Sequence, residues 1–210
     1  MEFDPRLKHP FTGMVVGPTQ CGKTTLVLNL IERADEAIAP PPERYIWCYD
    51  KFPPAADYIG KEIEFVDGLP DVDGLLNDSK RTLIVIKDLM LETNRSVSKL
   101  FTKGSHHRNV SVIYVSQNLY SKNKENRTIS LNTHYLVLFK NPRDSSYIAC
   151  LGRQIYPNDA RHFYEAFDDA TLQPHNYLLM DFKQSTPDEC RLRAIVFPDS
   201  GLAVYIKRYK

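Results

Sequence analysis

The segment GPTQCGKTT, residues 17–25, constrains the fold of this chain more than any other feature of its sequence. It fits the pattern G-x-x-x-x-G-K-[ST] of a phosphate-binding loop. Gly17 and Gly22 allow the backbone to turn so that its N–H groups point toward phosphate oxygens. Lys23 is then placed to reach the β- and γ-phosphates, and the Thr24 hydroxyl to ligate Mg²⁺. We therefore expect a site for a nucleoside triphosphate.

The segments on either side of this loop argue against a chance match. The loop follows the apolar run GMVV and opens the amphipathic segment TTLVLNLIERA, as a strand–loop–helix unit requires. Cys21 lies inside the loop, where we expect a small filler rather than a nucleophile. The predicted nucleotide-binding residues are Gly17, Pro18, Thr19, Gln20, Cys21, Gly22, Lys23, Thr24 and Thr25.

The hydrophobic pattern predicts an α/β fold in one domain that covers residues 1–210. Nearly continuous apolar runs in the first half indicate a mostly parallel sheet with helices on both faces, followed by antiparallel additions near the C-terminus. Residues 69–78 are expected to form a turn or a short helix, and residues 119–128 a polar loop. Strands are expected at 12–17, 44–49, 62–66, 82–86, 109–117, 133–140, 176–182 and 191–197, and helices at about 23–35, 93–103, 144–151 and 157–168.

The composition argues against several classes of protein. A net charge of +1 over 210 residues excludes a uniformly basic nucleic-acid binder. The four cysteines lack CxxC spacing, which favours a reduced intracellular setting. The N-terminus has no apolar signal-peptide core, and no run approaches the roughly 18 apolar residues of a membrane-spanning helix. We expect a soluble intracellular protein without a membrane partner.

The segment RTLIVIKDLMLE, residues 81–92, reads as a second buried strand that ends in charged residues. In nucleotide-hydrolysing proteins such a strand usually ends in an acid that holds Mg²⁺. Here Lys87 comes first and Asp88 second. A third buried run, SVIYVSQN at 111–118, ends in Gln117, which is a candidate sensor of the γ-phosphate or a polar residue that caps the strand.

Other phosphate-loop classes fit less well. The base-reading Asn-Lys-x-Asp of GTPases is incomplete at residues 123–126, which read NKEN, and no LSGGQ-type signature of transporter ATPases is present. A small-molecule or nucleotide kinase stays open, because its arginine-bearing lid has no firm sequence pattern. A nucleotide-binding subunit that does not hydrolyse ATP also stays open.

Six segments together resemble a known family. The chain is similar to genome-packaging ATPases of the FtsK/HerA type, and most of all to those of Polinton (Maverick) elements and related eukaryotic DNA viruses. The resemblance extends over nearly the whole chain. It is carried by HPFTGMVVGPTQCGKTT, RYIWCYD, LIVIKDLM, LFTKGSHHRNVSVIYVSQNLY, LNTHYLVLFKNPRD and YLLMDF.

The resemblance implies a RecA-like additional-strand (ASCE) fold and ATP-driven movement of double-stranded DNA into a capsid. It implies ATP and Mg²⁺ as cofactors, a homo-oligomeric ring, capsid or portal partners, and a location in the host nucleus or at a cytoplasmic virus-assembly site. Such ATPases show two acids at the strand end, of which the first holds Mg²⁺ and the second polarises the attacking water. Lys87 occupies the position of the first acid and Asp88 that of the second, which implies a catalytic role for Asp88. Because a cation at a metal-ligand position repels Mg²⁺, we expect slow hydrolysis, unless Asp88 joins Thr24 as a metal ligand and Glu92 or a water completes the site.

A ring motor also needs a cation from the neighbouring subunit and a grip on DNA phosphates. By resemblance we favour Arg108 as this arginine finger, followed by Arg143; Arg127 and Arg153 are further candidates. Basic segments at 102–109, 121–127 and 207–210 are candidates for DNA contact or are simply solvated loops. The adjacent His106 and His107 do not predict zinc, since no Cys or acidic partner lies at ligand spacing.

Overall fold

The computed structural model describes residues 3–49, 60–69, 79–87, 97–98, 100–104, 109–119, 124–143, 145–197, 201 and 203–207. Two short strands, β1 (Leu7–Lys8) and β3 (Ile38–Ala39), pair in parallel as a small separate sheet. The strands of the main sheet are β2 (Thr12–Val16), β4 (Arg44–Tyr49), β5 (Glu64–Asp67), β6 (Thr82–Lys87), β7 (Val110–Ser116), β8 (Tyr135–Phe139), β9 (Tyr177–Asp181), β10 (Leu192–Ala194) and β11 (Ala203–Val204).

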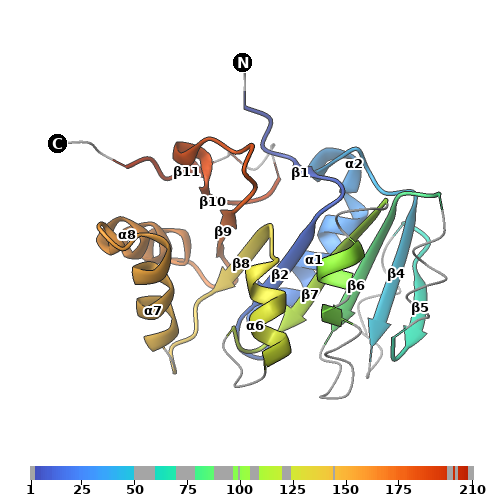
Figure 1. The fold of residues 1–210 in the computed structure, drawn as a ribbon, viewed down its shortest axis with the longest axis horizontal. Helices are drawn as coiled ribbons and strands as arrows, with labels where there is room; N and C mark the ends of the chain where they lie inside the picture. The colour runs from blue at the N-terminus through green and yellow to red at the C-terminus, as the bar shows by residue number, and fades with distance from the viewer. Residues whose placement is uncertain are drawn as a thin grey trace.

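The main sheet is mostly parallel and runs in the order β11-β10-β9-β8-β2-β7-β6-β4-β5 (Figure 1). All pairings from β5 to β8 are parallel, whereas β8–β9, β9–β10 and β10–β11 are antiparallel. The predicted mixed α/β fold, with antiparallel additions near the C-terminus, is thus confirmed. In this order β7 lies between β2 and β6, so the strand ends that carry the candidate site residues are neighbours.

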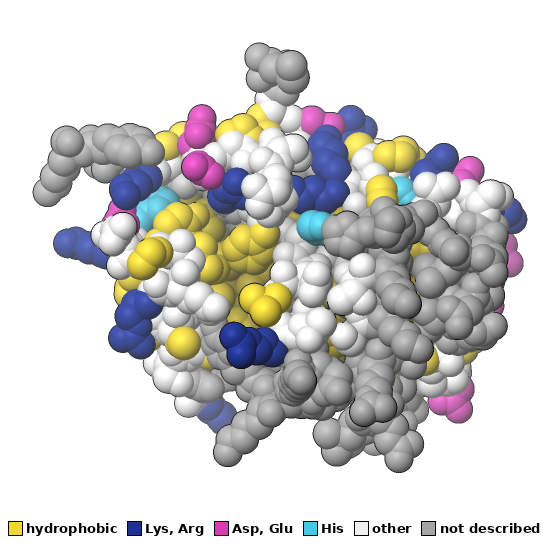
Figure 2. Space-filling model, in the orientation of Figure 1, with side chains coloured by type: hydrophobic (Ala, Val, Ile, Leu, Met, Phe, Trp, Pro, Cys, Tyr) yellow, Lys and Arg dark blue, Asp and Glu magenta, His cyan; other side chains and the backbone are white. Residues whose placement is uncertain are grey.

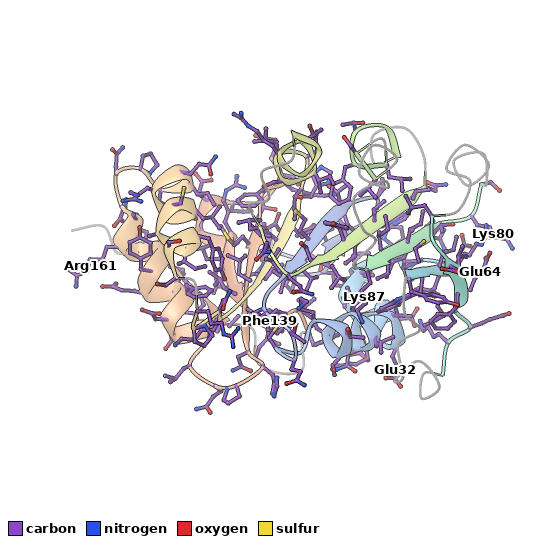
Figure 3. All side chains as sticks on the ribbon, turned by 90° about the horizontal axis from the view of Figure 1, so that it is seen from below. Glu32, Glu64, Lys80, Lys87, Phe139 and Arg161 are labelled. Carbon is purple, nitrogen blue, oxygen red and sulfur yellow. The ribbon has the colours of Figure 1, made fainter. Side chains whose placement is uncertain are left out.

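Helices cover both faces of the sheet. The helical segments are α1 (Lys23–Glu32), α2 (Ala34–Ala37), α6 (Lys124–Leu131), α7 (Ser146–Ile155), α8 (Ala160–Ala170), and the short η2 (Leu100–Gly104) and η3 (Asp188–Cys190). Figures 1 and 3 show α1 on one face and α6 on the other, with α7 and α8 beside the antiparallel end. The expected helical layers on both faces are present.

The strands alternate between two apolar clusters, one on each face of the sheet. In β6, Ile84 and Ile86 belong to the cluster that includes Ile129 of α6, whereas Leu83 and Val85 belong to the cluster beside α1. Because successive strand residues point to opposite faces, Lys87 shares the face of Leu83 and Val85. The register of β6 therefore directs the lysine toward α1.

Three predicted elements differ from the structure. The strand expected at 191–197 ends at Ala194, because Ile195 has a φ of 70° and leaves the extended conformation. Part of the loop expected at 119–128 belongs to α6, where Ile129 is fully buried while Leu131 is 68% exposed. The helix expected at 23–35 is interrupted at Arg33, which has a φ of −103° and a ψ of 30°.

Several sequence predictions lie outside the described residues. They include Asp88, Arg108, His106 and His107, most of the turn predicted at 69–78, and the first part of the helix predicted at 93–103. Of that helix, residues 97–98 and η2 are helical. Among the described residues, no helix is long and apolar enough to cross a membrane. On the described part of one face, Figure 2 shows Lys and Arg side chains at several separate places rather than in one patch.

Candidate nucleotide-binding site

A cavity of about 710 Å³ lies beside the loop between β2 and α1. On one side it is lined by residues of the predicted phosphate-binding loop, which we call the near wall (residues 17–25). It is also lined by His175 and Tyr177 and by Ile195 and Phe197, which we call the far wall (residues 175–177 and 195–197). Its volume is in the range of small-molecule and cofactor sites.

The near wall is a tight backbone turn. Gly17 N–H donates to the carbonyl of Ser116 in β7 (3.3 Å), and Leu26 N–H donates to the carbonyl of Gly22 (2.9 Å) at the start of α1. Gly22 has a φ of 107°, a conformation that favours glycine. The sequence reason for a glycine at position 22 is therefore visible in the backbone.

Gly17 is required for a different reason, which is close packing. A Cβ atom at this position would lie 2.6 Å from Phe139 Cβ and 2.7 Å from Cys21 Sγ. Phe139 is the last residue of β8 and is 1% exposed. The loop can therefore approach the end of β8 only because Gly17 has no side chain.

Lys23 is buried at the base of the near wall, with 7% of its surface exposed. Its ammonium group donates to the carbonyl oxygens of Gly17 (2.6 Å) and Pro18 (2.7 Å). Burial raises the pKa of the neighbouring Cys21 thiol, and Lys23 only partly opposes this shift. A raised pKa keeps the thiol neutral, which agrees with the expectation that Cys21 is a filler.

Gln117 and Lys87 line the same cavity as Lys23 and Thr24. Gln117 follows the last residue of β7, in a turn where Asn118 N–H donates to the Ser116 hydroxyl (3.3 Å). Figure 3 shows Lys87 at the end of β6, on the side of the sheet that α1 covers. The ends of β6 and β7 therefore both reach the cavity, and the charged residue that β6 brings to it is Lys87.

The described lining residues do not form a magnesium site. Thr24 offers one hydroxyl ligand, Lys87 brings a positive charge, and none of the described lining residues is a carboxylate. Oxygen ligands, usually including carboxylates, are what Mg²⁺ needs. Asp88 lies outside the described residues, so magnesium binding by Thr24 and Asp88 stays a prediction.

Of the candidate arginine fingers, Arg127, Arg143 and Arg153 lie within the described residues and are exposed. The described lining of the 710 Å³ cavity includes none of them. A second cavity of about 210 Å³ shares Gln117 with the first and also contacts Gly17 and Cys150. An arginine that reaches the nucleotide from the same subunit is therefore not seen among these three.

The far wall is the part of the site that the sequence did not predict. His175 Nδ1–H donates to the carbonyl of Cys21 (3.2 Å), so the far wall touches the phosphate-binding loop directly. Tyr177 and Phe197 come from segments that sequence patterns predicted only as strands. The unusual residue in this region is an isoleucine in the left-handed conformation, which composition and periodicity do not reveal.

Comparison with known proteins gives a relative by sequence and, among several matching solved structures, a structural neighbour. The chain is 29% identical to "Packaging protein 1" of human adenovirus C serotype 5 over 119 residues, which are 50% of this chain and 26% of that protein. It therefore matches about a quarter of that protein's length. No family model matches the chain.

The structural neighbour is the genome packaging NTPase B204 from Sulfolobus turreted icosahedral virus 2, solved in complex with AMPPCP. The TM-score is 0.52 at 14% sequence identity, over 88% of this chain and 96% of that chain. At this identity the likeness concerns the fold alone. The expected resemblance is thus shown in part, as a weak sequence similarity to a viral packaging protein and a likeness of fold to a viral genome-packaging NTPase, whereas the FtsK/HerA type and the closeness to Polinton elements stay predictions.

Proposed function

We propose that this chain is an ATPase of a viral or transposon genome-packaging motor, which binds ATP in the 710 Å³ cavity and moves double-stranded DNA into a capsid. The predicted working form is a ring of identical subunits that contacts capsid or portal proteins. The proposal takes residues 1–210 as one ATPase domain that acts in the host nucleus or at a cytoplasmic assembly site.

The observation that carries the proposal is the convergence of three strand ends on one cavity. Lys23 follows β2, Gln117 follows β7 and Lys87 ends β6, and all three line the cavity. Because β7 lies between β2 and β6, a sensor residue on β7 has access to the phosphates that the near wall would hold. This order supports the additional-strand class of phosphate-loop NTPase.

The packaging part of the proposal rests on the relatives. The adenovirus protein is a packaging protein and B204 is a genome packaging NTPase. A motor of this kind must grip DNA of any sequence, which favours contacts to backbone phosphates. We assign these contacts to the basic segments at 102–109, 121–127 and 207–210, and the finger of the neighbouring subunit to Arg108.

Lys87 favours slow hydrolysis, and with it a second candidate function. A lysine in the cavity adds a positive charge beside Lys23, which attracts phosphate but repels a divalent cation. A subunit with this arrangement is suited to bind ATP, and the same geometry fits a subunit that supports assembly without turnover. The two functions differ in phosphate release, not in nucleotide binding.

The test is ATP hydrolysis with and without double-stranded DNA, measured on the natural chain, Lys87→Asp and Lys23→Ala. We expect slow turnover in the natural chain, faster DNA-stimulated turnover in Lys87→Asp, and neither binding nor turnover in Lys23→Ala. Nucleotide binding measured in the same samples separates the motor from the non-hydrolysing subunit.

Two outcomes count against these statements. Robust turnover in the natural chain would refute slow hydrolysis, although the motor proposal would stand. If neither the natural chain nor Lys87→Asp binds DNA or oligomerises with any nucleotide, the motor proposal fails.

A further inference from the structure

The backbone of this protein carries unusual conformations around one cavity. Among the described residues, three that are not glycine have a positive φ: Gln20 (66°), His175 (66°) and Ile195 (70°). All three line the 710 Å³ cavity. The left-handed conformation costs a residue with a side chain roughly 1–2 kcal/mol, and such strain gathers at binding sites. A β-branched residue such as Ile195 is the least expected of the three.

The two segments of the far wall are held to each other and to the near wall. Val196 N–H donates to the Tyr177 hydroxyl (3.1 Å), which joins the segment after β10 to the start of β9. His175 Nδ1–H donates to the Cys21 carbonyl, and the side chain of His175 lies 3.5 Å from where a Cβ on Gly22 would be. The strained segments therefore have a defined position opposite the phosphate-binding loop.

Phe197 contributes an aromatic side chain to the cavity lining. Its side chain is 7% exposed, and the guanidinium carbon of Arg33 lies 4.4 Å from the ring centroid. Arg33 directly follows α1, whereas Lys23 begins it. Six residues of helix span about 9 Å, so the lining contributed by α1 extends from the cationic Lys23 to Asn29, and Phe197 adds an aromatic side chain to the same lining.

The side chains between these ends change character along the cavity. Thr24 and Thr25 follow Lys23 directly, Leu26 lies about one turn further along α1, and Asn29 lies nearly two turns along. Leu26, Tyr177 and Phe197 belong to the same apolar cluster, against which Ile195 also packs. A ligand that fits both ends has an anionic group at one end and a flat apolar group at the other.

We propose that the far wall binds the base of a nucleoside triphosphate whose phosphates lie on the near wall. This inference rests on the proposed function and assigns the base to Tyr177, Ile195 and Phe197. A nucleobase has apolar π faces that stack on aromatic side chains. The strain at Ile195 is then the cost of presenting its side chain to the ligand rather than continuing β10.

The experiment compares two ligands that differ in whether they carry a base. Isothermal titration calorimetry measures the affinities of AMPPCP and of inorganic triphosphate for the natural chain and for Phe197→Ala. We expect the natural chain to bind AMPPCP more tightly, and Phe197→Ala to bind it roughly tenfold more weakly. The affinity for inorganic triphosphate should stay unchanged, because the near wall is intact.

A matched control is Leu131→Ala, which removes an exposed leucine of α6 that is not part of the described cavity lining. It should change neither affinity. If Phe197→Ala fails to fold, Phe197→Leu replaces it in the experiment, because leucine keeps most of the apolar volume but has no ring. We expect Phe197→Leu to bind AMPPCP more weakly and to bind inorganic triphosphate with unchanged affinity.

The outcomes separate this inference from the proposed function. If the natural chain binds triphosphate as well as AMPPCP, or if the Phe197 variants weaken both ligands equally, the base is not on the far wall although the phosphate site stands. If the natural chain binds neither ligand, both proposals are overturned.

Discussion

The two walls of the cavity are built in different ways. The near wall is one continuous segment, residues 17–25, whose shape comes from glycines and from backbone hydrogen bonds such as that from Gly17 N–H to the Ser116 carbonyl. The far wall joins segments centred about 20 residues apart, and side chains such as Tyr177 and His175 hold it in place. A wall made by backbone keeps its shape when a neighbouring side chain changes, whereas a wall made by side chains does not.

The largest test of this difference is the buried ion pair that joins β9 and β10, the two strands from which the far wall extends. Asp181 at the end of β9 pairs with Arg193 of β10 at 2.8 Å, and their side chains are 4% and 1% exposed. Asp181→Ala leaves a buried guanidinium uncompensated, which costs about 3–5 kcal/mol of unfolding free energy. Urea denaturation measures the loss.

A double variant, Asp181→Leu with Arg193→Met, is the control for this prediction. Because it removes both charges and keeps apolar volume, it should recover most of the stability. If the single variant costs less than about 1 kcal/mol, the ion pair does not anchor the two strands from which the far wall extends.

The next test acts on the near wall. Gly17→Ala introduces a Cβ 2.6 Å from Phe139 Cβ, and such overpacking costs about 1–3 kcal/mol. The loop must move, so the affinities for AMPPCP and for inorganic triphosphate should fall together, unlike in Phe197→Ala. Gly13→Ala in the preceding strand β2 is the matched control, since its nearest atoms are 3.6 Å away. Equal effects of Gly17→Ala and Gly13→Ala would contradict the close approach.

A smaller effect tests the strain in the far wall. At ordinary strand positions glycine is less stable than alanine by about 0.5–1 kcal/mol. At Ile195, with its φ of 70°, we expect Ile195→Gly to be about 1 kcal/mol more stable than Ile195→Ala. Thermal unfolding of both variants measures the difference in stability. The control is the pair Ile46→Gly and Ile46→Ala at a buried strand position. If the alanine variant is more stable than the glycine variant at both positions, the backbone at Ile195 is not strained.

The same contrast explains which parts of the site could be predicted from sequence. The phosphate-binding loop is encoded by nine adjacent residues whose glycines have a conformational role, so its pattern is visible. The strands β2, β6 and β7 are apolar runs, and their polar ends at Lys87 and Gln117 are apparent from the sequence. Parallel pairing then brings these ends to one edge of the sheet.

The remaining parts depend on tertiary contacts that have no local pattern. α6 is stabilised by burial of Ile129 within a mostly polar segment. The segment therefore has no amphipathic pattern from which a helix could be predicted. β10 ends because Ile195 turns toward the cavity, although the apolar run continues to Phe197. The far wall results from these turns, and its chemistry could be recognised only once both segments were placed opposite the loop.

The last prediction concerns the pH dependence of stability at His9, which contacts Ser111 of β7 outside both walls. His9 is 9% exposed and its Nδ1 lies 2.6 Å from the Ser111 hydroxyl of β7. Burial, with the nearby cations Arg81 and Lys183, lowers the pKa of His9 to about 4. The unfolded chain takes up a proton near pH 6.5, whereas the folded chain does so only near pH 4. The unfolded state therefore binds more protons between these values, so the free energy of unfolding should fall as the pH decreases from about 6.5 to about 4.

His9→Asn should flatten this slope, because asparagine does not titrate, and chemical denaturation at several pH values measures it. At a pH near 5 at which denaturation shows both proteins to be folded, the ratio of the AMPPCP and triphosphate affinities should be the same in the natural chain and in His9→Asn. His9 belongs to neither wall. Protonation of the unfolded state changes the fraction of protein that is folded, but it does not change the contacts that the folded cavity makes to the base or to the phosphates. If the ratio differs between the two proteins, the residue at position 9 affects one wall more than the other. The statement that the two walls are independent would then be wrong.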